Sequence, residues 1–118
     1  MKIEVQIEPL PQPRPRFSNG RCYEPAKITK YKQAIGLFAT SVMKDKPPTT
    51  APVKVLLKLW RKYKPTSKRF GDFDNHAKSV CDALNKIVWL DDAQVISCTV
   101  EKYQGKPKVE IEVTEIME

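Results

Sequence analysis

The period of the apolar residues changes several times along this chain, and these changes limit the folds that it can adopt. Apolar and polar residues alternate, as they do in strands with one buried face, in segments 2–8, 53–60, 95–103 and 108–115. Helical spacing replaces this alternation in two other segments, from 27 to 44 and from 74 or 75 to 88. Strands and helices are therefore expected to follow one another along the chain.

Turn signals add hairpins to this order. Asn19-Gly20 separates residues 16–18 from 21–23, which predicts a small hairpin near the N-terminus. Gly105 separates the last two alternating segments and predicts a second hairpin between them. We expect an α+β fold in which a mixed β-sheet packs against two helices, in the order β-α-β-α-β-β with the small hairpin near the N-terminus. The length suits a single domain over residues 1–118.

Positive charge is concentrated in the first part of the chain. Residues 1–70 carry 16 Lys or Arg against 4 Asp or Glu, whereas residues 71–118 carry 5 against 10. Such asymmetry places a basic surface beside an acidic site, which suits a polyanion such as nucleic acid. A solvated basic surface that only maintains solubility is the alternative. Candidate phosphate contacts are Arg14 and Arg16 in the extended proline-rich segment, and Arg21, Arg61, Lys62, Lys64, Lys68 and Arg69 further along.

The usage of cysteine and histidine excludes several kinds of site. Three widely spaced cysteines without a CxxC pair argue against disulfides and zinc, and they suit a reducing, cytoplasmic setting. A hydrolase of the Ser-His-Asp or Cys-His kind would depend on His76, the sole histidine. No apolar stretch is long enough to span a membrane, and Glu4 and Glu8 argue against a signal peptide. We expect no membrane partner and no nucleotide cofactor, and a catalytic metal would need oxygen ligands.

Aspartates stand on both sides of the second helical segment. Asp72 and Asp74 end the basic loop, and alternate side chains of an extended segment point the same way. One of Asp91 and Asp92 can return to the same place if the turn after the helix folds back along it. Three carboxylates suit Mg²⁺, with Mn²⁺ as a substitute, and phosphodiester hydrolases use such ions. Alternatively, the first pair caps the helix and the second pair forms an ordinary turn.

Two further polar residues lie off the apolar arc of this helix. Lys78 follows Asp74 by one turn, where its charge would stabilise a reacting phosphate or form a surface ion pair. Asp82, one turn further, would support Lys78 or the metal, or would be solvated.

Three motifs in this region resemble the RusA-type Holliday junction resolvases. They are Asp72-Phe73-Asp74-Asn75 followed by Lys78, then Cys81-Asp82-Ala83-Leu84-Asn85, then Trp89-Leu90-Asp91-Asp92-Ala93-Gln94-Val95. Their order and spacing are close to those of the family. Arg14-Pro15-Arg16-Phe17 and Tyr23 resemble the opening of phage and prophage members. Phe73 and His76 depart from the family's motif without replacing a catalytic group.

The resemblance implies a metal-dependent, homodimeric endodeoxyribonuclease that resolves four-way DNA junctions by paired symmetric nicks, in recombination and repair. Asp72, Asp74 and Asp92 match the family's essential carboxylates and Lys78 its essential lysine, with Asp91 as a less certain neighbour. Phe70 or Phe73 would stack at the junction centre, although a loop phenylalanine beside a helix also packs into cores. Other interpretations are a non-catalytic basic DNA-binding protein, a nuclease of broader specificity for branched DNA or flaps, and a protein-interaction module.

Overall fold

The computed structural model describes residues 1–13, 16–18, 21–23 and 25–117. Its elements are β1 (Lys2–Val5), β2 (Arg16–Ser18), β3 (Arg21–Tyr23), α1 (Ala26–Met43), β4 (Val53–Arg61), α2 (Phe73–Leu84), the 3₁₀ turn η1 (Asp92–Gln94), β5 (Val95–Gln104) and β6 (Lys108–Glu115). This order confirms the predicted α+β class. It also confirms the small antiparallel hairpin, β2–β3, near the N-terminus.

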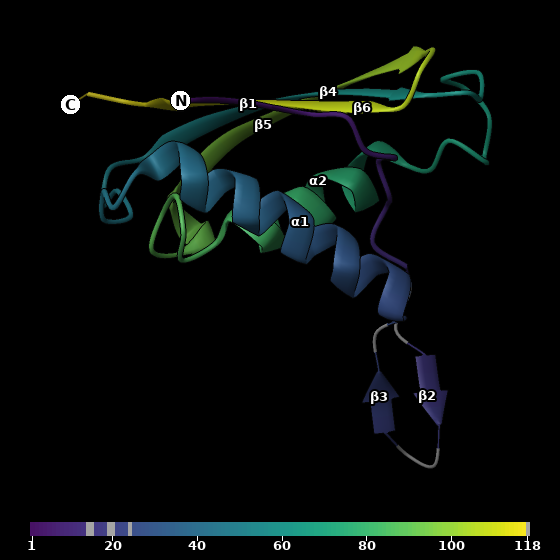
Figure 1. Ribbon diagram of the computed structural model, residues 1–118, viewed down its shortest axis with the longest axis horizontal. Helices are drawn as coiled ribbons and strands as arrows, with labels where there is room; N and C mark the ends of the chain where they lie inside the picture. The colour runs from purple at the N-terminus through teal and green to yellow at the C-terminus, as the bar shows by residue number, and fades with distance from the viewer. Residues whose placement is uncertain (14–15, 19–20, 24, 118) are drawn as a thin grey trace.

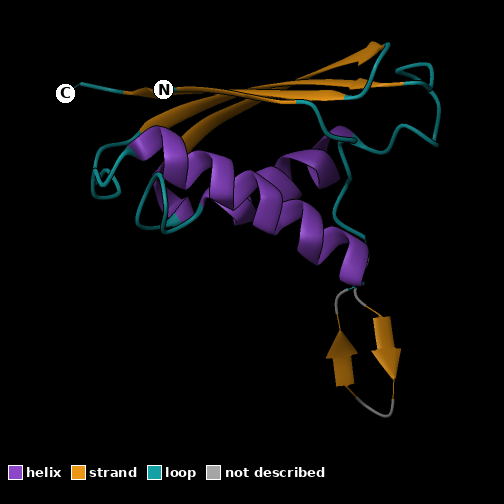
Figure 2. Cartoon of the chain, viewed as in Figure 1, coloured by secondary structure: helices purple, strands orange, loops and turns teal. Residues whose placement is uncertain are grey.

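A mixed sheet with the strand order β1-β6-β4-β5 forms one layer, and both helices cover one of its faces (Figure 1). The β2–β3 hairpin stands apart from both layers (Figure 2). The predicted hairpin between the last two strands is wrong, because β4 lies between them, parallel to β5 and antiparallel to β6. β4 is more deeply buried than β5. Its place inside the sheet suits this burial, because a neighbouring strand covers each of its two edges. Residues 96–99 of β5 are all exposed, as an edge strand allows.

The alternation of buried and more exposed residues along β4 places one face of this strand in the core. Its inward residues Val53, Val55, Leu57 and Leu59 are at most 2% exposed, and they belong to one apolar cluster with Ile35 of α1 and other residues of both helices. Burying each such side chain contributes ~1.5–3 kcal/mol. Neither α1 nor α2 covers the opposite face of the sheet, which carries charged side chains on neighbouring strands (Figure 1). One example joins β6 to β1, where Lys108 Nζ lies 3.8 Å from Glu4 Oε1.

The second helix is shorter than predicted, because it ends at Leu84 rather than at residue 88. Lys86 adopts a left-handed conformation with φ of 69°, and its N–H donates to the Trp89 carbonyl at 2.7 Å. The chain therefore reverses after Leu84. The apolar residues that follow, Val88 and Trp89, reach the core from a turn instead of a helix.

Polar residues take part in the buried face of α2, which the apolar arc did not predict. His76 and Ser79 are both fully buried. The Ser79 hydroxyl donates to the Leu10 carbonyl at 2.7 Å, and the Gln12 N–H donates to the Asn75 carbonyl at 2.9 Å. Residues 10–12 of the N-terminal segment therefore run beside α2. In the part of the chain that the structure describes, no helix has both the length and the apolar composition needed to cross a bilayer.

Candidate active site

Asp72 and Asp74 lie at the start of α2. Asp72 is the residue before the first helical turn and has extended backbone angles, φ −71° and ψ 143°, but its side chain accepts no capping hydrogen bond. Asp74, in the first turn, accepts a hydrogen bond from the Asn75 N–H at 3.0 Å. Both residues are exposed. The capping alternative therefore does not account for Asp72, and its carboxylate stands available at the surface.

Asp91 and Asp92 have different local contacts. Asp91 Oδ1 accepts from the Ala93 N–H at 2.8 Å, and Gln94 Oε1 accepts from the Asp91 N–H at 2.9 Å, which makes a reciprocal capping box. Asp92 Oδ1 accepts from the indole N–H of the buried Trp89 at 2.8 Å. The Asp91 side chain thus stabilises the turn, whereas the Asp92 carboxylate is held by a hydrogen bond from a core residue, Trp89. Gln94 was missed as a positioning residue, although the D-x-x-Q spacing of a capping box indicates it.

The carboxylates do not converge as the sequence predicted. Among the described residues, no group of three or more His, Cys, Asp or Glu side chains is placed to hold a metal ion. The reason is the direction of α2. Gly71, before the start of α2, accepts a hydrogen bond from Lys102 near the end of β5, whereas Cys81, near the end of α2, lies close enough to Cys98 of β5 for the two thiols to shift each other's pKa. α2 therefore runs antiparallel to β5, and Asp92, just before β5, lies at the far end of the helix from Asp72.

The length of the helix gives the size of this gap. Asp72 and Cys81 are separated by ~14 Å along the axis at ~1.5 Å per residue. The neighbouring Cys98 and burial raise the pKa of the Cys81 thiol, and the negative charge of Asp92 is near enough to add to this effect. A three-carboxylate centre is thus not formed. The pair Asp72 and Asp74 still fits an oxygen-ligated cation, because Mg²⁺ is commonly bound through one or two carboxylates together with phosphate oxygens and waters.

The basic loop leads directly to this pair of carboxylates. Its exposed cations are Lys62, Lys64, Lys68 and Arg69. Arg61 is different and corrects the expectation that it faces phosphates: it is 8% exposed, its Nε donates to Glu8 Oε1 at 2.7 Å, and its Nη1 donates to the Phe70 carbonyl at 2.8 Å. Arg14 lies outside the described residues, and Arg16 and Arg21 belong to the β2–β3 hairpin.

The two phenylalanines have opposite environments. Phe70 is fully buried in the core, so it is not available to stack on a base, which corrects that part of the expectation. Phe73, in the first turn of α2 between the two aspartates, is 63% exposed. Lys78 is exposed one turn beyond Asp74, and no ion pair joins the two within the described part of the chain. Asp82 contacts neither: its Oδ2 lies 3.3 Å from Lys32 Nζ on α1.

His76 lies in the core beneath the start of α2 and is not exposed at the surface. Its Nε2–H donates to the Phe70 carbonyl at 2.7 Å, and its buried Nδ1 has no hydrogen-bond partner among the described residues. Burial lowers the pKa of His76 from 6.5 to about 4, so the ring is neutral at pH 7. Gly71 lies against it with φ of 100°, where a Cβ would stand 2.8 Å from His76 Nε2.

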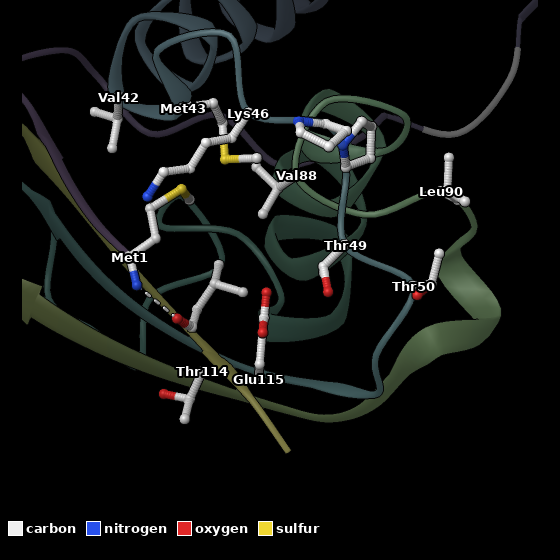
Figure 3. Close-up of a pocket in the computed structure, with 13 residues that line it drawn as sticks. Met1, Val42, Met43, Lys46, Thr49, Thr50, Val88, Leu90, Thr114 and Glu115 are labelled. Atoms are coloured by element: carbon white, nitrogen blue, oxygen red, sulfur yellow. Dashed lines mark hydrogen bonds between the residues drawn. The ribbon is translucent and has the colours of Figure 1, made fainter. Parts of the chain in front are cut away.

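A large hollow in the surface lies away from these carboxylates. A cavity of about 990 Å³ is bordered by the end of α1, the start of β1 and the end of β6, and no aspartate lines it. Met1 and Val88 contribute to its wall, and the Met1 amino group donates to the Val113 carbonyl at 2.9 Å (Figure 3). Small-molecule sites are usually such concave cavities. Asp72 and Asp74 instead lie on an open surface beside a basic loop, an arrangement that suits a polymer.

Comparison with known proteins agrees with this geometry. Residues 6–114 match the endodeoxyribonuclease RusA family. The chain belongs to this family. It is also 34% identical to the uncharacterized protein YqaN of Bacillus subtilis (strain 168), over 98% of this chain and 96% of that protein. The resemblance found in the sequence motifs is therefore confirmed.

Membership of the RusA family implies a Holliday junction resolving endonuclease that binds branched DNA and requires a divalent metal. For this RusA protein, the open carboxylate pair at the end of an exposed basic loop is the part of the surface where such chemistry fits. The Trp89–Val95 motif is placed at the other end of α2, where its turn is built by Asp91 and Gln94.

Proposed function

We propose that this RusA protein is a Mg²⁺-dependent, homodimeric endonuclease, a single domain over residues 1–118, that cuts four-way junctions by paired symmetric nicks in DNA recombination and repair. Mn²⁺ would substitute for Mg²⁺. The observation that carries the proposal is the uncapped, exposed carboxylate of Asp72 beside Asp74, directly after a loop with four exposed cations. Cations that contact phosphates next to carboxylates that hold a metal are what a nuclease requires.

Each residue has a specific role in this proposal. Asp72 and Asp74 hold the ion, which when bound neutralises phosphate charge and lowers the pKa of a water. Lys78, one turn along the helix, stabilises negative charge that develops on the phosphate. Lys62, Lys64, Lys68 and Arg69, with Arg14, Arg16 and Arg21, contact the DNA backbone. The exposed Phe73 stacks at the junction centre.

The homodimer follows from the symmetry of the substrate. A four-way junction is roughly two-fold symmetric, and one site cuts one strand at a time, so a two-fold protein presents a site to each of two strands. Asp92 has a particular place in this arrangement. Because it lies at the far end of α2 from Asp72, it joins that centre only if a second copy supplies it or if the turn before β5 rearranges on DNA.

The test is cleavage of a synthetic four-way junction beside linear duplex of the same sequence, with Mg²⁺, Mn²⁺ or EDTA. The enzymes are wild type, Asp74→Asn and, as a matched control, Asp45→Asn, which changes an exposed aspartate after α1. We expect symmetric, metal-dependent nicks in the junction alone, lost in Asp74→Asn and kept in Asp45→Asn. Tight junction binding without cutting in any metal would instead support a DNA-binding protein.

A second candidate is a nuclease of broader specificity. It is favoured by the exposure of Asp72 and Asp74, because carboxylates at the surface are accessible to DNA of more than one shape. The same assay on flaps and three-way junctions at equal salt separates the two, because phosphate contacts depend steeply on ionic strength. Comparable rates on all branched substrates would favour the broader enzyme.

A further inference from the structure

The three residues before Asp72 present their carbonyl groups to basic side chains from three different elements. Arg61 of β4 donates from Nη1 to the carbonyls of Arg69 at 3.2 Å and Phe70 at 2.8 Å. His76 of α2 donates to the same Phe70 carbonyl at 2.7 Å. Lys102 of β5 donates from Nζ to the Gly71 carbonyl at 3.1 Å. We call these three donors, Arg61, His76 and Lys102, the carbonyl clamp.

Lys102 differs from the other two donors. Arg61 and His76 are buried and connect parts of the core, so their loss would disturb the fold itself. Lys102 is half-buried on the edge strand, with its ammonium 5.2 Å from the centroid of the Phe70 ring. Within the described residues it forms no ion pair with a carboxylate. The polar contact of its ammonium group is thus with the Gly71 carbonyl, in the backbone directly before Asp72.

This backbone sets the position of the Asp72 carboxylate. Since the Asp72 side chain accepts no capping hydrogen bond, its place depends on the preceding peptide. Gly71 has φ of 100°, and the space where a Cβ would point is filled by Pro11 and His76. Its carbonyl direction is therefore fixed on one side by packing and on the other by Lys102. Both the Lys102 ammonium and the Asp72 carboxylate lie close enough to the His76 ring to act on its pKa.

We propose that Lys102 is a positioning residue of the active site, which holds the Gly71 carbonyl and thereby places the Asp72 carboxylate for metal and phosphate. The inference rests on the proposed nuclease function. It assigns Lys102 a role distinct from that of the loop lysines, which contact phosphates. A displacement of a reacting group by ~1 Å is enough to lower a rate by ~100-fold. A lysine that only binds phosphate would instead lower the affinity for DNA.

The experiment compares Lys102→Met, Lys102→Arg and the control Lys106→Met. Methionine keeps an apolar stem over Phe70 and removes the ammonium, arginine restores a donor, and Lys106 is an exposed lysine in the β5–β6 turn. Three quantities are measured: the dissociation constant for a four-way junction in EDTA, the single-turnover cleavage rate against Mg²⁺ concentration, and hydrogen exchange of the amides from 70 to 76 without DNA.

For Lys102→Met we expect a rate that is ~10- to 100-fold lower, a higher Mg²⁺ requirement, unchanged junction affinity and faster exchange at the start of α2. Lys102→Arg should recover most of the rate, and Lys106→Met should behave as wild type. An unchanged rate, or a loss of affinity that accounts for the whole loss of rate, would overturn the proposal. Inactivity of the wild type would mark failure of the nuclease function; unchanged exchange in Lys102→Met would overturn the positioning role in either case.

Discussion

The buried His76 makes the stability of this protein depend on pH in a direction that can be worked out. Its pKa is about 4 in the folded protein against 6.5 for an ordinary histidine. Between these values the unfolded chain binds a proton that the folded chain does not, so acid favours unfolding. The stabilisation is fully present above pH 6.5 and is lost as the pH falls towards 4.

The size of the effect follows from the two values. Each tenfold difference in proton affinity is worth ~1.4 kcal/mol, so the full difference is about 3 kcal/mol, of which about 2 kcal/mol is lost between pH 7.5 and pH 5. The assay is urea unfolding in EDTA across this range, for wild type and His76→Gln. Glutamine can still donate to the Phe70 carbonyl but does not titrate, so the carboxylates contribute equally to both curves.

We expect the wild type to lose about 2 kcal/mol more than His76→Gln between these two pH values. The reasoning can also be checked in the folded state, because His76 is the sole histidine and its ring proton signal in NMR needs no assignment. Parallel stability curves, or a ring signal that titrates near pH 6.5 in the folded protein, would refute it.

Two other predictions concern the same helix. Gly71→Ala should lower the free energy of unfolding by ~2–5 kcal/mol, because it combines a positive φ with a Cβ 2.7 Å from Pro11 Cγ. The control in the same urea titration is Gly105→Ala, whose Cβ would lie 3.4 Å from Trp60. Equal effects of the two substitutions would contradict the argument. If a second copy supplies Asp92, mixing inactive Asp72→Asn and Asp92→Asn proteins should restore one intact site per mixed dimer, measured as single-strand nicks in the junction. No recovery in verified mixed dimers would favour a centre made within one chain.

Local sequence patterns determined much of the fold and indicated the family. The two-residue period of β4 specified which side chains face the core, since successive side chains of a strand point to opposite faces. The helical spacing placed α1 within a residue of its observed bounds. The motifs around Asp72 and Trp89 resemble those of the RusA family, and the match over residues 6–114 confirms that the chain belongs to it.

Long-range packing decided the rest. Whether β5 pairs with β6 or with β4 depends on which strand takes an inner position in the sheet, with a neighbour at each edge. The turn signal at Gly105 concerns only the two strands beside it and does not show that a third strand lies between them. Whether Arg61 meets solvent depends on Glu8, which lies far away in the sequence. The distance between Asp72 and Asp92 depends on the direction in which α2 crosses the sheet. Sequence therefore supplied the candidate site residues of this RusA protein. Tertiary structure decided which of them meet, because burial and contact are properties of segments brought together from distant parts of the chain.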